Sequence, residues 1–425
     1  MSKNLGLGTI AVQGGYKPKP GEPRVLPIFQ STSYMQGDAD EVAALFNLEK
    51  EGHIYTRISN PTVAAFEEKY AQLQGGVAAV ATSSGQAAIF YAIANIAKAG
   101  DHIISTSAIY GGTFNLFNIN LRKFGIEVSF IDAEASEEEI LALAKENTKA
   151  VYGEMVGNPG LNILDLDKFS RVAKKIGVPL IVDNTVPSPY LCNPFEFGVD
   201  IVVHSTTKYS DGHAVAVGGI IVDGGTFDWT NGKFPEFTEP DASYHGIIYT
   251  ETFGKAAYAV KARVTLLRDL GAAPSPFNAF LTNLGLETLH LRMERHSLNA
   301  LRLAQFLSKH PKIEWVNYPY LEGSSQYERA KKYLKGGASG VLTFGIKGGL
   351  EAGKKLISSL KVASHVVNLG DARTYILHPA STTHAQLTEE EQKASGVSPD
   401  LLRVSIGIED TEDIISDFEQ ALNEI

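Results

Sequence analysis

Short apolar segments alternate with helical segments through the first half of the chain, and this alternation constrains the fold more than any other feature. Apolar runs typical of strands occupy residues 77–82, 102–106, 128–131, 150–155, 179–182 and 201–203. Helical spacing lies between them at 86–97, 113–122, 137–145 and 166–176. Strands that are apolar on both sides and separated by helices form a mostly parallel sheet covered by helices. The pattern predicts an α/β fold with ligands at the carboxyl ends of the strands.

The alternation begins with a clear helix start. Asn60 can cap the first free amides, Pro61 suits the first helical position, and Gly75 is expected to end the helix. Residues 1–59 have several prolines and glycines but little periodicity, which predicts an extended arm. Such an arm buries little of itself, so we expect it to lie on a neighbouring subunit or across its own body.

The rest of the chain divides into two parts. Residues 60–283 form the expected main domain, interrupted at 224–254 by an aromatic and acidic insertion without periodicity, typical of a functional or mobile segment. A long helical stretch from residue 276 leads into a predicted C-terminal domain at 284–425. That domain has a strand-like run at 340–344 and a helical one at 352–359.

The composition of the chain limits which kinds of molecule it is expected to bind. A chain of 425 residues with 44% hydrophobic content can bury a substantial core. Its net charge of -10 argues against nucleic acid and anionic membranes as partners, whereas a small anionic substrate needs only a local basic pocket. The single cysteine, Cys192, excludes an intramolecular disulfide and has no thiolate-activating neighbours. Without a secretory signal or a membrane-spanning run, we expect a cytoplasmic protein that binds small molecules.

The stretch from Asp200 to Gly219, DIVVHSTTKYSDGHAVAVGG, places Lys208 beside a polar cluster at residues 204–207. A solvated loop lysine is the ordinary interpretation, because lysine is mostly exposed. The hydroxyl groups and the following Gly218 and Gly219 instead indicate a crowded site where backbone approaches a ligand. A desolvated amine loses its proton readily and can attack a carbonyl carbon. Lys208 is therefore a candidate for imine formation, and pyridoxal phosphate is the carbonyl compound most commonly held in this way.

Such a cofactor needs a phosphate cradle and an acidic partner for its pyridine nitrogen. Residues 83–88, SSGQAA, lead from a strand into a helix, where free amides bind phosphate and Gly85 permits close approach, although small residues also suit any tight turn. Asp183 ends the apolar run PLIVDN, where an unpaired carboxylate is costly. It could be a cap or turn residue. With Lys208 after the next strand, pairing with a protonated pyridine nitrogen explains it better.

Four further residues extend the candidate site. Tyr110, in the turn SAIYGGT, could stack on the cofactor ring or be a core tyrosine. Tyr55 and Arg57 lie in the arm, and arginine is the natural bidentate partner of a phosphate. Arg403 begins the late run LLRVSIG, and we assign it a substrate carboxylate in preference to a surface ion pair. No metal site is predicted.

Motifs along essentially the whole chain resemble those of the pyridoxal-phosphate enzymes of cysteine and methionine metabolism. In order they are YTRISNPT, ATSSGQAA, SAIYGGT, Glu154 with Asn158-Pro159, IVDNT, HSTTKYSDGH, HPASTTH and LLRVSIG. The resemblance implies pyridoxal 5'-phosphate as cofactor, bound by residues 60–283. It also implies the fold type I, aspartate-aminotransferase-like architecture, with a smaller C-terminal α/β domain and an extended N-terminal arm.

The resemblance assigns catalytic and substrate roles to particular residues. Lys208 matches the Schiff-base lysine and Asp183 the partner of the pyridine nitrogen. Tyr110 matches the ring-stacking tyrosine that also assists proton transfers. Asn158 and Arg403 match contacts to the substrate carboxylate and to the cofactor.

The same resemblance assigns the phosphate contacts. Those within the subunit are Ser84, Gly85, Gln86, Ser205 and Thr207. Tyr55 and Arg57 match residues that reach the phosphate of the neighbouring subunit, and Tyr55 is also a candidate substrate contact. This implies an obligate homodimer, commonly doubled to a tetramer that is a dimer of dimers.

Within the family, the STTHAQL segment at 381–387 and the insertion at 224–254 resemble one branch. That branch replaces the acetate of O-acetyl-L-homoserine by sulfide or methanethiol, giving L-homocysteine or L-methionine in methionine biosynthesis. Methionine γ-lyases usually carry a cysteine where Gly112 stands. The resemblance therefore implies γ-replacement, with Lys208 as general base. The alternatives are a methionine γ-lyase or a cystathionine γ-synthase or lyase on the same site, and a cofactor-free binding protein that keeps the fold.

Overall fold

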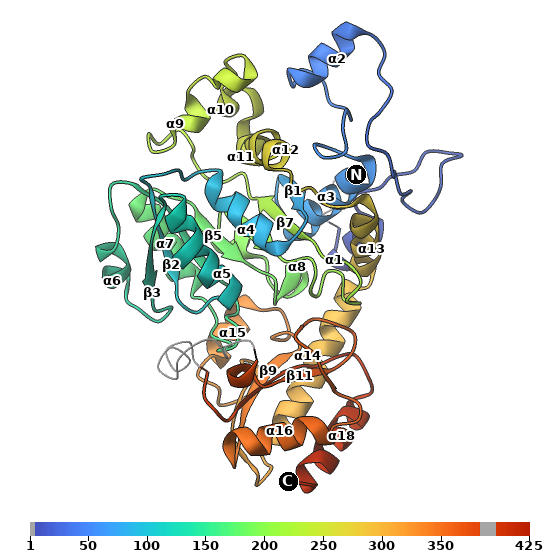
Figure 1. The fold of residues 1–425 in the computed structure, drawn as a ribbon, viewed down its shortest axis with the longest axis vertical. Coiled ribbons are helices and arrows are strands. Elements are labelled where there is room, and N and C mark those ends of the chain that lie inside the picture. Colours follow the sequence, from blue (N-terminus) through green and yellow to red (C-terminus); the bar gives the residue numbers. More distant parts are fainter. Residues whose placement is uncertain (1–4, 383–396) are drawn as a thin grey trace.

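The computed structural model describes residues 5–382 and 397–425, which build two sheets flanked by helices (Figure 1). The seven-stranded sheet has the order β1-β7-β6-β5-β4-β2-β3. Only β7 runs antiparallel to its neighbours. The strands are β1 (Ala78–Thr82), β2 (His102–Thr106), β3 (Glu127–Ile131), β4 (Thr148–Glu154), β5 (Leu180–Asp183), β6 (Ile201–His204) and β7 (Gly219–Asp223). The predicted mostly parallel sheet is confirmed.

The central strands are buried on both faces, which explains their continuous apolar sequences. Every residue of β2, β5, β6 and β7 is buried. Helix α4 packs against β6 and β7, while α7 packs against β4 and β5. The flanking helices are α3 (Pro61–Gln74), α4 (Gly85–Ala94), α5 (Gly111–Asn115), the π-helix η1 (Leu116–Leu121), α6 (Glu137–Ala142), α7 (Leu166–Ile176), α8 (Ser188–Leu191) and the 3-10 helix η2 (Pro194–Phe197).

Helix α3 begins and ends as its sequence predicts. The Asn60 side chain accepts hydrogen bonds from the backbone N–H groups of Thr62 and Val63, and Pro61 follows in the first turn. Gly75 ends the helix with a φ of 81°, a left-handed conformation that glycine adopts without strain. The predicted helix at 113–122 differs, because the structure divides it into α5 and the π-helix η1.

The insertion is more ordered than its lack of periodicity suggests. It contains α9 (Pro235–Thr238), the 3-10 helix η3 (Ala242–Tyr244) and α10 (Tyr249–Phe253). Its aromatic residues form a small core together with Tyr258, which follows the insertion. The Trp229 ring stacks on Phe237 and Tyr258, with centroids 4.4 and 5.3 Å away. Ring packing therefore supplies the order that hydrophobic periodicity does not reveal. The chain continues through η4 (Gly254–Ala256), α11 (Ala257–Lys261), the π-helix η5 (Ala262–Leu267) and α12 (Arg268–Leu270).

The long helical stretch from residue 276 forms two helices and leads to the second sheet. Helix α13 (Pro276–Glu287) ends at Thr288, and α14 (Leu289–Leu307) continues from it. The five-stranded sheet has the order β10-β11-β12-β9-β8. Its elements are β8 (Ile313–Asn317), α15 (Tyr327–Tyr333), β9 (Val341–Ile346), α16 (Gly349–Ser359), β10 (Ser364–His365), β11 (Tyr375–Leu377), the 3-10 helix η6 (Pro379–Ser381), β12 (Leu401–Ser405) and α18 (Thr411–Asn423).

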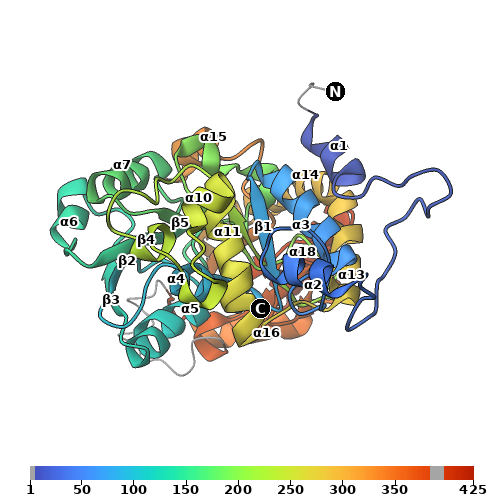
Figure 2. The same cartoon turned by 90° about the horizontal axis from the view of Figure 1, so that it is seen from above.

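The N-terminal arm is largely extended but contains two helices that the sequence pattern did not predict. Helix α1 (Leu7–Gln13) packs against α3, α13 and α14. Helix α2 (Ala39–Phe46) is capped by the Asp38 side chain, which accepts a hydrogen bond from the Glu41 N–H. Between them the dark blue chain projects away from the body of the molecule (Figure 2).

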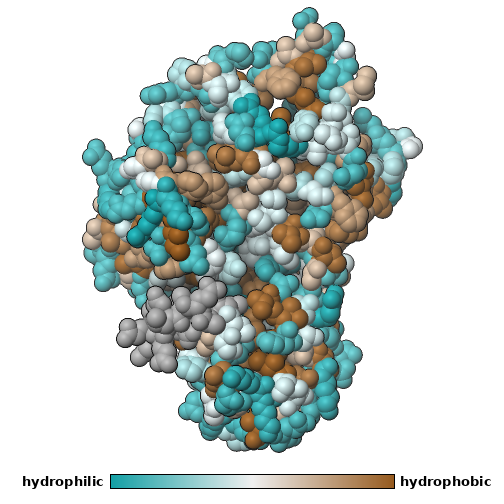
Figure 3. All heavy atoms as spheres, viewed as in Figure 1, coloured by the Kyte–Doolittle hydropathy of each residue, from teal (hydrophilic) through white to brown (hydrophobic). Residues whose placement is uncertain are grey.

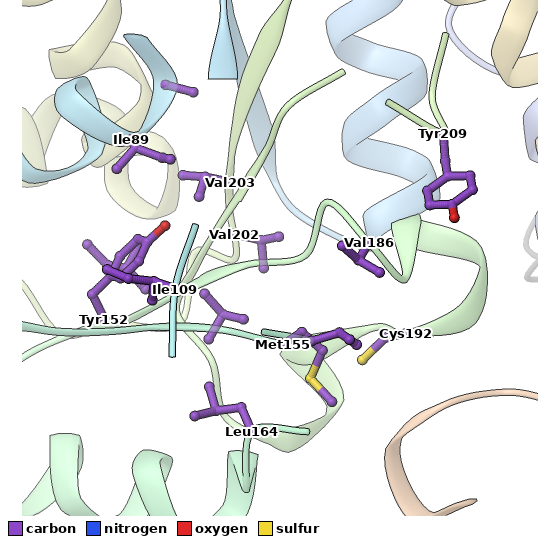
Figure 4. Packing of buried hydrophobic residues seen from close by; sticks show 14 of the residues in the cluster. Ile89, Ile109, Tyr152, Met155, Leu164, Val186, Cys192, Val202, Val203 and Tyr209 are labelled. Carbon is purple, nitrogen blue, oxygen red and sulfur yellow. The ribbon is translucent and has the colours of Figure 1, made fainter. Parts of the chain in front are cut away.

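Two sequence expectations concern single segments. Residues 383–387 of the STTHAQL segment lie outside the described residues. Cys192 is fully buried among apolar side chains (Figure 4), and burial raises the pKa of its thiol, as its lack of activating neighbours predicts. In the described ranges, every helix is too short or too polar to cross a membrane.

Candidate active site

A cavity of about 260 Å³ opens at the carboxyl ends of the parallel strands, where the two sheets meet. The large domain contributes residues that follow β1, β4, β5 and β6, and the C-terminal domain contributes a loop before β11 and one residue of β12. The lining residues for which the sequence predicted a role are Ser84, Gly85, Gln86, Tyr110, Asn158, Asp183, Ser205, Thr207, Lys208 and Arg403. Residues more than 300 positions apart in the chain therefore share one concave site.

Lys208 presents a buried amine to this cavity. Its Nζ donates a hydrogen bond to Asn368 Oδ1 at 2.7 Å. Burial, followed by the positive charge of Arg403, lowers the pKa of Lys208 to about 8. Because an amide oxygen rather than a carboxylate accepts the hydrogen bond, no negative charge opposes this shift. The amine is deprotonated over a much wider pH range than an ordinary lysine and can act as a nucleophile.

The loop that carries Asn368 approaches the lysine backbone closely. Gly370 has a φ of 81°, and a side chain there would lie 2.8 Å from the Tyr209 backbone nitrogen. Only glycine fits this turn without strain. Gly370 thereby allows the C-terminal domain to place Asn368 against the lysine of the large domain.

Two carboxyl groups lie side by side beneath the cavity. Glu154 on β4 and Asp183 on β5 are register partners in the parallel ladder. Burial raises the pKa of Asp183 to about 6, although its Oδ1 accepts a hydrogen bond from the Thr185 N–H at 2.8 Å. Burial and then the charge of Asp183 raise the pKa of Glu154 well above its ordinary value. Asp183 is therefore the more readily ionised member of the pair.

The charge of Asp183 has no counterion among the residues that the structure describes. Among residues 5–382 and 397–425, no cationic side chain forms an ion pair with it. A buried unpaired carboxylate is costly, and a cationic group of a ligand placed in the cavity would relieve that cost. Asp183 thus fits the pyridinium nitrogen of a pyridoxal cofactor.

The N-terminus of α4 forms an anion cradle at the edge of the cavity. Ser84 caps the helix by accepting a hydrogen bond from the Ala87 N–H at 3.2 Å, which leaves the first amides free to face a ligand. A side chain at Gly85 would lie 2.6 Å from the Ser205 Cβ. Glycine at this position lets the turn approach the hydroxyl residues after β6. The combination of free amides, helix dipole and hydroxyl groups suits a phosphate.

Tyr110 lies at the mouth of the site with its backbone fixed and its ring free on one side. Its N–H donates a hydrogen bond to Glu154 Oε1 at 2.7 Å, which connects the turn before α5 to the sheet. The residue is 52% exposed and lines the cavity. This position suits a ring that covers a flat ligand.

Arg403 forms the anion-binding side contributed by the C-terminal domain. Its guanidinium donates hydrogen bonds to Asn158 Oδ1 and to the Asn368 carbonyl oxygen, both at 3.1 Å. Burial lowers the pKa of Arg403 to about 10, so the group remains charged at neutral pH. In the described part of the chain, no carboxylate forms an ion pair with Arg403. A carboxylate of a ligand would satisfy this buried charge.

Tyr55 and Arg57 do not line the cavity of this chain. Both are exposed residues of the arm, and the Arg57 guanidinium lies 5.2 Å from the centre of the Tyr55 ring. Their turn is connected to the body of the protein by Arg263, which donates a hydrogen bond to the Ile58 carbonyl oxygen at 3.0 Å. The buried Glu67 pairs with the same guanidinium at 2.7 Å.

The sequence analysis missed several residues of the site. No local sequence pattern marks Asn368 as a site residue, because only the fold brings it to a lysine 160 positions away. Thr185 was quoted only within the IVDNT motif, yet its Oγ1 accepts a hydrogen bond from the Ser205 N–H at 2.8 Å. Glu154 was quoted as part of a motif without a role. Across the described ranges, no group of three or more His, Cys, Asp or Glu residues is placed to hold a metal ion.

Comparisons with known proteins agree with this geometry. The profile of the Cys/Met metabolism PLP-dependent enzyme family matches residues 8–423. The O-acetyl-L-homoserine sulfhydrylase of Leptospira meyeri is 51% identical over 100% of this chain and 98% of its own length. The homocysteine synthase of Schizosaccharomyces pombe is 49% identical over 97% of both chains. A crystal structure of a putative O-acetylhomoserine (thiol)-lyase from Campylobacter jejuni, containing N'-pyridoxyl-lysine-5'-monophosphate, superimposes with a TM-score of 0.95. It is 38% identical and covers 99% of this chain and 100% of its own.

Proposed function

This chain belongs to the Cys/Met metabolism PLP-dependent enzyme family, and we propose that it exchanges the acetate of O-acetyl-L-homoserine for sulfide, giving L-homocysteine and acetate. Methanethiol in place of sulfide gives L-methionine. The protein is thus a pyridoxal-phosphate-dependent transferase of methionine biosynthesis. The observation that carries the proposal is the meeting of a buried amine, an unpaired buried carboxylate and an anion cradle in one cavity.

The substrate assignment is supported by relatives that are about half identical over their whole length. The Leptospira meyeri and Schizosaccharomyces pombe proteins are named for making homocysteine or for sulfhydrylating O-acetyl-L-homoserine. The same reaction therefore suits the cavity described here.

Three sets of residues would hold pyridoxal 5'-phosphate. Lys208 would bind it covalently through its amine, and Asp183 would pair with its pyridine nitrogen. The phosphate would lie against the α4 cradle and the hydroxyl residues after β6. In the proposal these phosphate contacts are Ser84, Gly85, Gln86, Ser205 and Thr207. When bound, the cofactor withdraws electrons from the substrate carbons next to the amino group and so acidifies their hydrogens.

The protein side chains then bind the substrate and move its protons. In the proposal, Arg403 and Asn158, which share a hydrogen bond and line the cavity, bind the substrate carboxylate and so hold the α-carbon near Lys208. Lys208 Nζ takes the proton from that carbon and returns it after sulfide has replaced acetate at the γ-carbon. Tyr110 covers the ring and assists these proton transfers. Asp183 would keep the pyridine nitrogen of the bound cofactor protonated.

We extend the proposal to the assembly. Tyr55 and Arg57 reach the phosphate of a neighbouring subunit, with Tyr55 also contacting substrate, so the active unit is a homodimer, doubled to a tetramer. Apolar residues of the arm support this, because Met35 is 97% exposed and Phe46 is 51% exposed. Figure 3 shows apolar atoms gathered over the same end of the molecule, near α2.

The domain division and the location complete the proposal. The arm comprises residues 1–59, the cofactor-binding domain 60–283 and the C-terminal domain 284–425. The last boundary lies within α13, the helix that leads out of the large domain. With a single buried cysteine, the protein suits the reducing cytoplasm.

Product identification tests the function. Purified holoenzyme is supplied with O-acetyl-L-homoserine and, separately, sulfide, methanethiol or cysteine, and the products are identified by mass spectrometry. We expect L-homocysteine, L-methionine and acetate, with the sulfide reaction preferred. Cystathionine as the main product would instead identify a cystathionine-forming synthase, and 2-oxobutanoate with ammonia would identify a lyase.

A further inference from the structure

The ring of Tyr110 is held by contact rather than by a hydrogen bond. Its backbone N–H is fixed by Glu154, but in the described part of the chain its hydroxyl forms no hydrogen bond. The side chain is half exposed, so one side of the ring faces open space. The position of the ring over the cavity must therefore be set by what it touches on its other side.

That neighbour is Gly112, two residues along in α5. A Cβ atom added at Gly112 would lie 2.5 Å from Cε1 and 3.1 Å from Cζ of the Tyr110 ring. The next nearest atom is the Gln86 side-chain nitrogen, at 3.2 Å. Gly112 lies within a helix and has no left-handed backbone conformation, so the backbone itself would accept a side chain. In this structure the Tyr110 ring occupies the space that a side chain at residue 112 would need.

We propose that Gly112 is a positioning residue for Tyr110, because the absence of a side chain there lets the ring lie against α5 and over the cavity. This inference rests on the proposed function, in which Tyr110 covers the cofactor. A Cβ at 112 would move the ring by about 1 Å before ordinary van der Waals contact is restored. Because the outer side of the ring is exposed, the ring can move without disturbing the core, so the variant should fold.

The adjacent glycine provides a matched control. A Cβ added at Gly111 meets nothing within 4 Å, and Gly111 belongs to the same helix. Gly111→Ala and Gly112→Ala thus add the same methyl group to consecutive positions and change helix propensity similarly. They differ in one respect, which is the contact with Tyr110.

The experiment compares the two holoenzyme variants by kcat/KM and by the visible circular dichroism of the bound cofactor. A misplacement of this size should lower kcat/KM about 10- to 100-fold in Gly112→Ala and change its dichroism. Gly111→Ala should keep the kcat/KM and the dichroism of the parent enzyme. In a Tyr110→Ala background, Gly112→Ala should add no further loss, because its effect operates through the missing ring.

Two outcomes would overturn the role of Gly112, and a third would overturn the role of Tyr110 as well. Equal behaviour of Gly112→Ala and Gly111→Ala, with Tyr110→Ala impaired, would overturn the role of Gly112 while leaving the proposed function intact. A full additional loss from Gly112→Ala in the Tyr110→Ala background would also overturn it, because the effect would then not involve the ring. If Tyr110→Ala itself changed neither kcat/KM nor dichroism, the assignment of Tyr110 would fail, and the inference with it.

Discussion

Lys208 differs from an ordinary lysine in what surrounds its amine. Burial and the charge of Arg403 favour the neutral form, and the hydrogen-bond acceptor is the uncharged Asn368. A neutral amine is the form that attacks an aldehyde, so the surroundings of Lys208 prepare it for the cofactor. Reactivity at this residue is therefore a property of three side chains from two domains.

Cofactor uptake should depend on pH through this amine. The neutral fraction of Lys208 increases as pH rises, so the rate at which apoenzyme binds pyridoxal phosphate should increase with pH, with a midpoint at about 8. Arg403→Gln removes a positive neighbour, which raises the pKa of Lys208 and moves the midpoint to higher pH. Stopped-flow absorbance measures the uptake rate as a function of pH in the parent enzyme and in Arg403→Gln. A midpoint near the ordinary lysine value of 10.5 in the parent enzyme would contradict the account.

Asn368 should also influence the pH dependence of cofactor uptake. Asn368→Ala removes one hydrogen bond and should lower kcat/KM about fivefold, corresponding to about 1 kcal/mol. Asn368→Asp places a negative charge 2.7 Å from Nζ and should raise the pKa of Lys208, moving the uptake midpoint upward. Unchanged midpoints in Asn368→Asp would show that the side chain does not hold the free amine.

The sequence predicted most of the site, and the reason for the exceptions is topological. Lys208 and Asp183 follow consecutive strands of a parallel sheet, so their proximity follows from the strand pattern alone. Asn368 lies in a loop of the other domain, and its approach depends on how two domains pack. No local pattern encodes that packing.

At the scale of elements, α3 connects the arm to the large domain. The Asn60 side chain accepts hydrogen bonds from two amides of α3 and donates one to the Phe29 carbonyl oxygen at 2.7 Å. A single amide side chain therefore caps the helix and attaches the arm. The two functions use different atoms and can be separated by substitution.

Substitutions of Asn60 should show this separation. Asn60→Ala should lower the free energy of unfolding by about 1–2 kcal/mol, because the cap is lost. Asn60→Ser keeps a neutral capping oxygen but loses the amide donor to Phe29, so it should cost less stability while making the arm more susceptible to limited proteolysis. Urea unfolding and proteolysis measure the two effects. Equal stability losses in both variants would show that the cap contributes nothing.

Strands and helices differed in how well their sequences predicted them. The strands β2, β5 and β6 are buried throughout, so their continuous apolar runs were sufficient. The antiparallel β7 was missed, because it follows the glycine-rich segment after Lys208 that suggested a loop. Helices α1 and α2 were missed because they are short and lie among prolines and glycines, where local periodicity is weak.

At the scale of the whole molecule, the proposed assembly makes each site depend on two subunits. Lys208 belongs to one subunit and Arg57 is proposed to come from its neighbour. Arg57 lies in the exposed arm and does not line the cavity of its own chain. Variants of these two residues should therefore complement each other.

Coexpression of Lys208→Ala and Arg57→Ala chains tests this sharing. Each variant alone should be nearly inactive, whereas random mixing produces heterodimers with one intact site and about a quarter of the parent activity. Activity of the mixture equal to the mean of the two separate variants would contradict a shared site. Light scattering of the same samples gives the oligomeric state.

The central claim is that Lys208 carries the cofactor in this cavity. Borohydride reduction of the holoenzyme fixes the cofactor to the amine that holds it, and mass spectrometry of the digested protein locates it. We expect a pyridoxyl phosphate group on Lys208 and on no other lysine, with none retained by Lys208→Ala. Attachment to a different lysine, or retention of the group by Lys208→Ala, would contradict that claim.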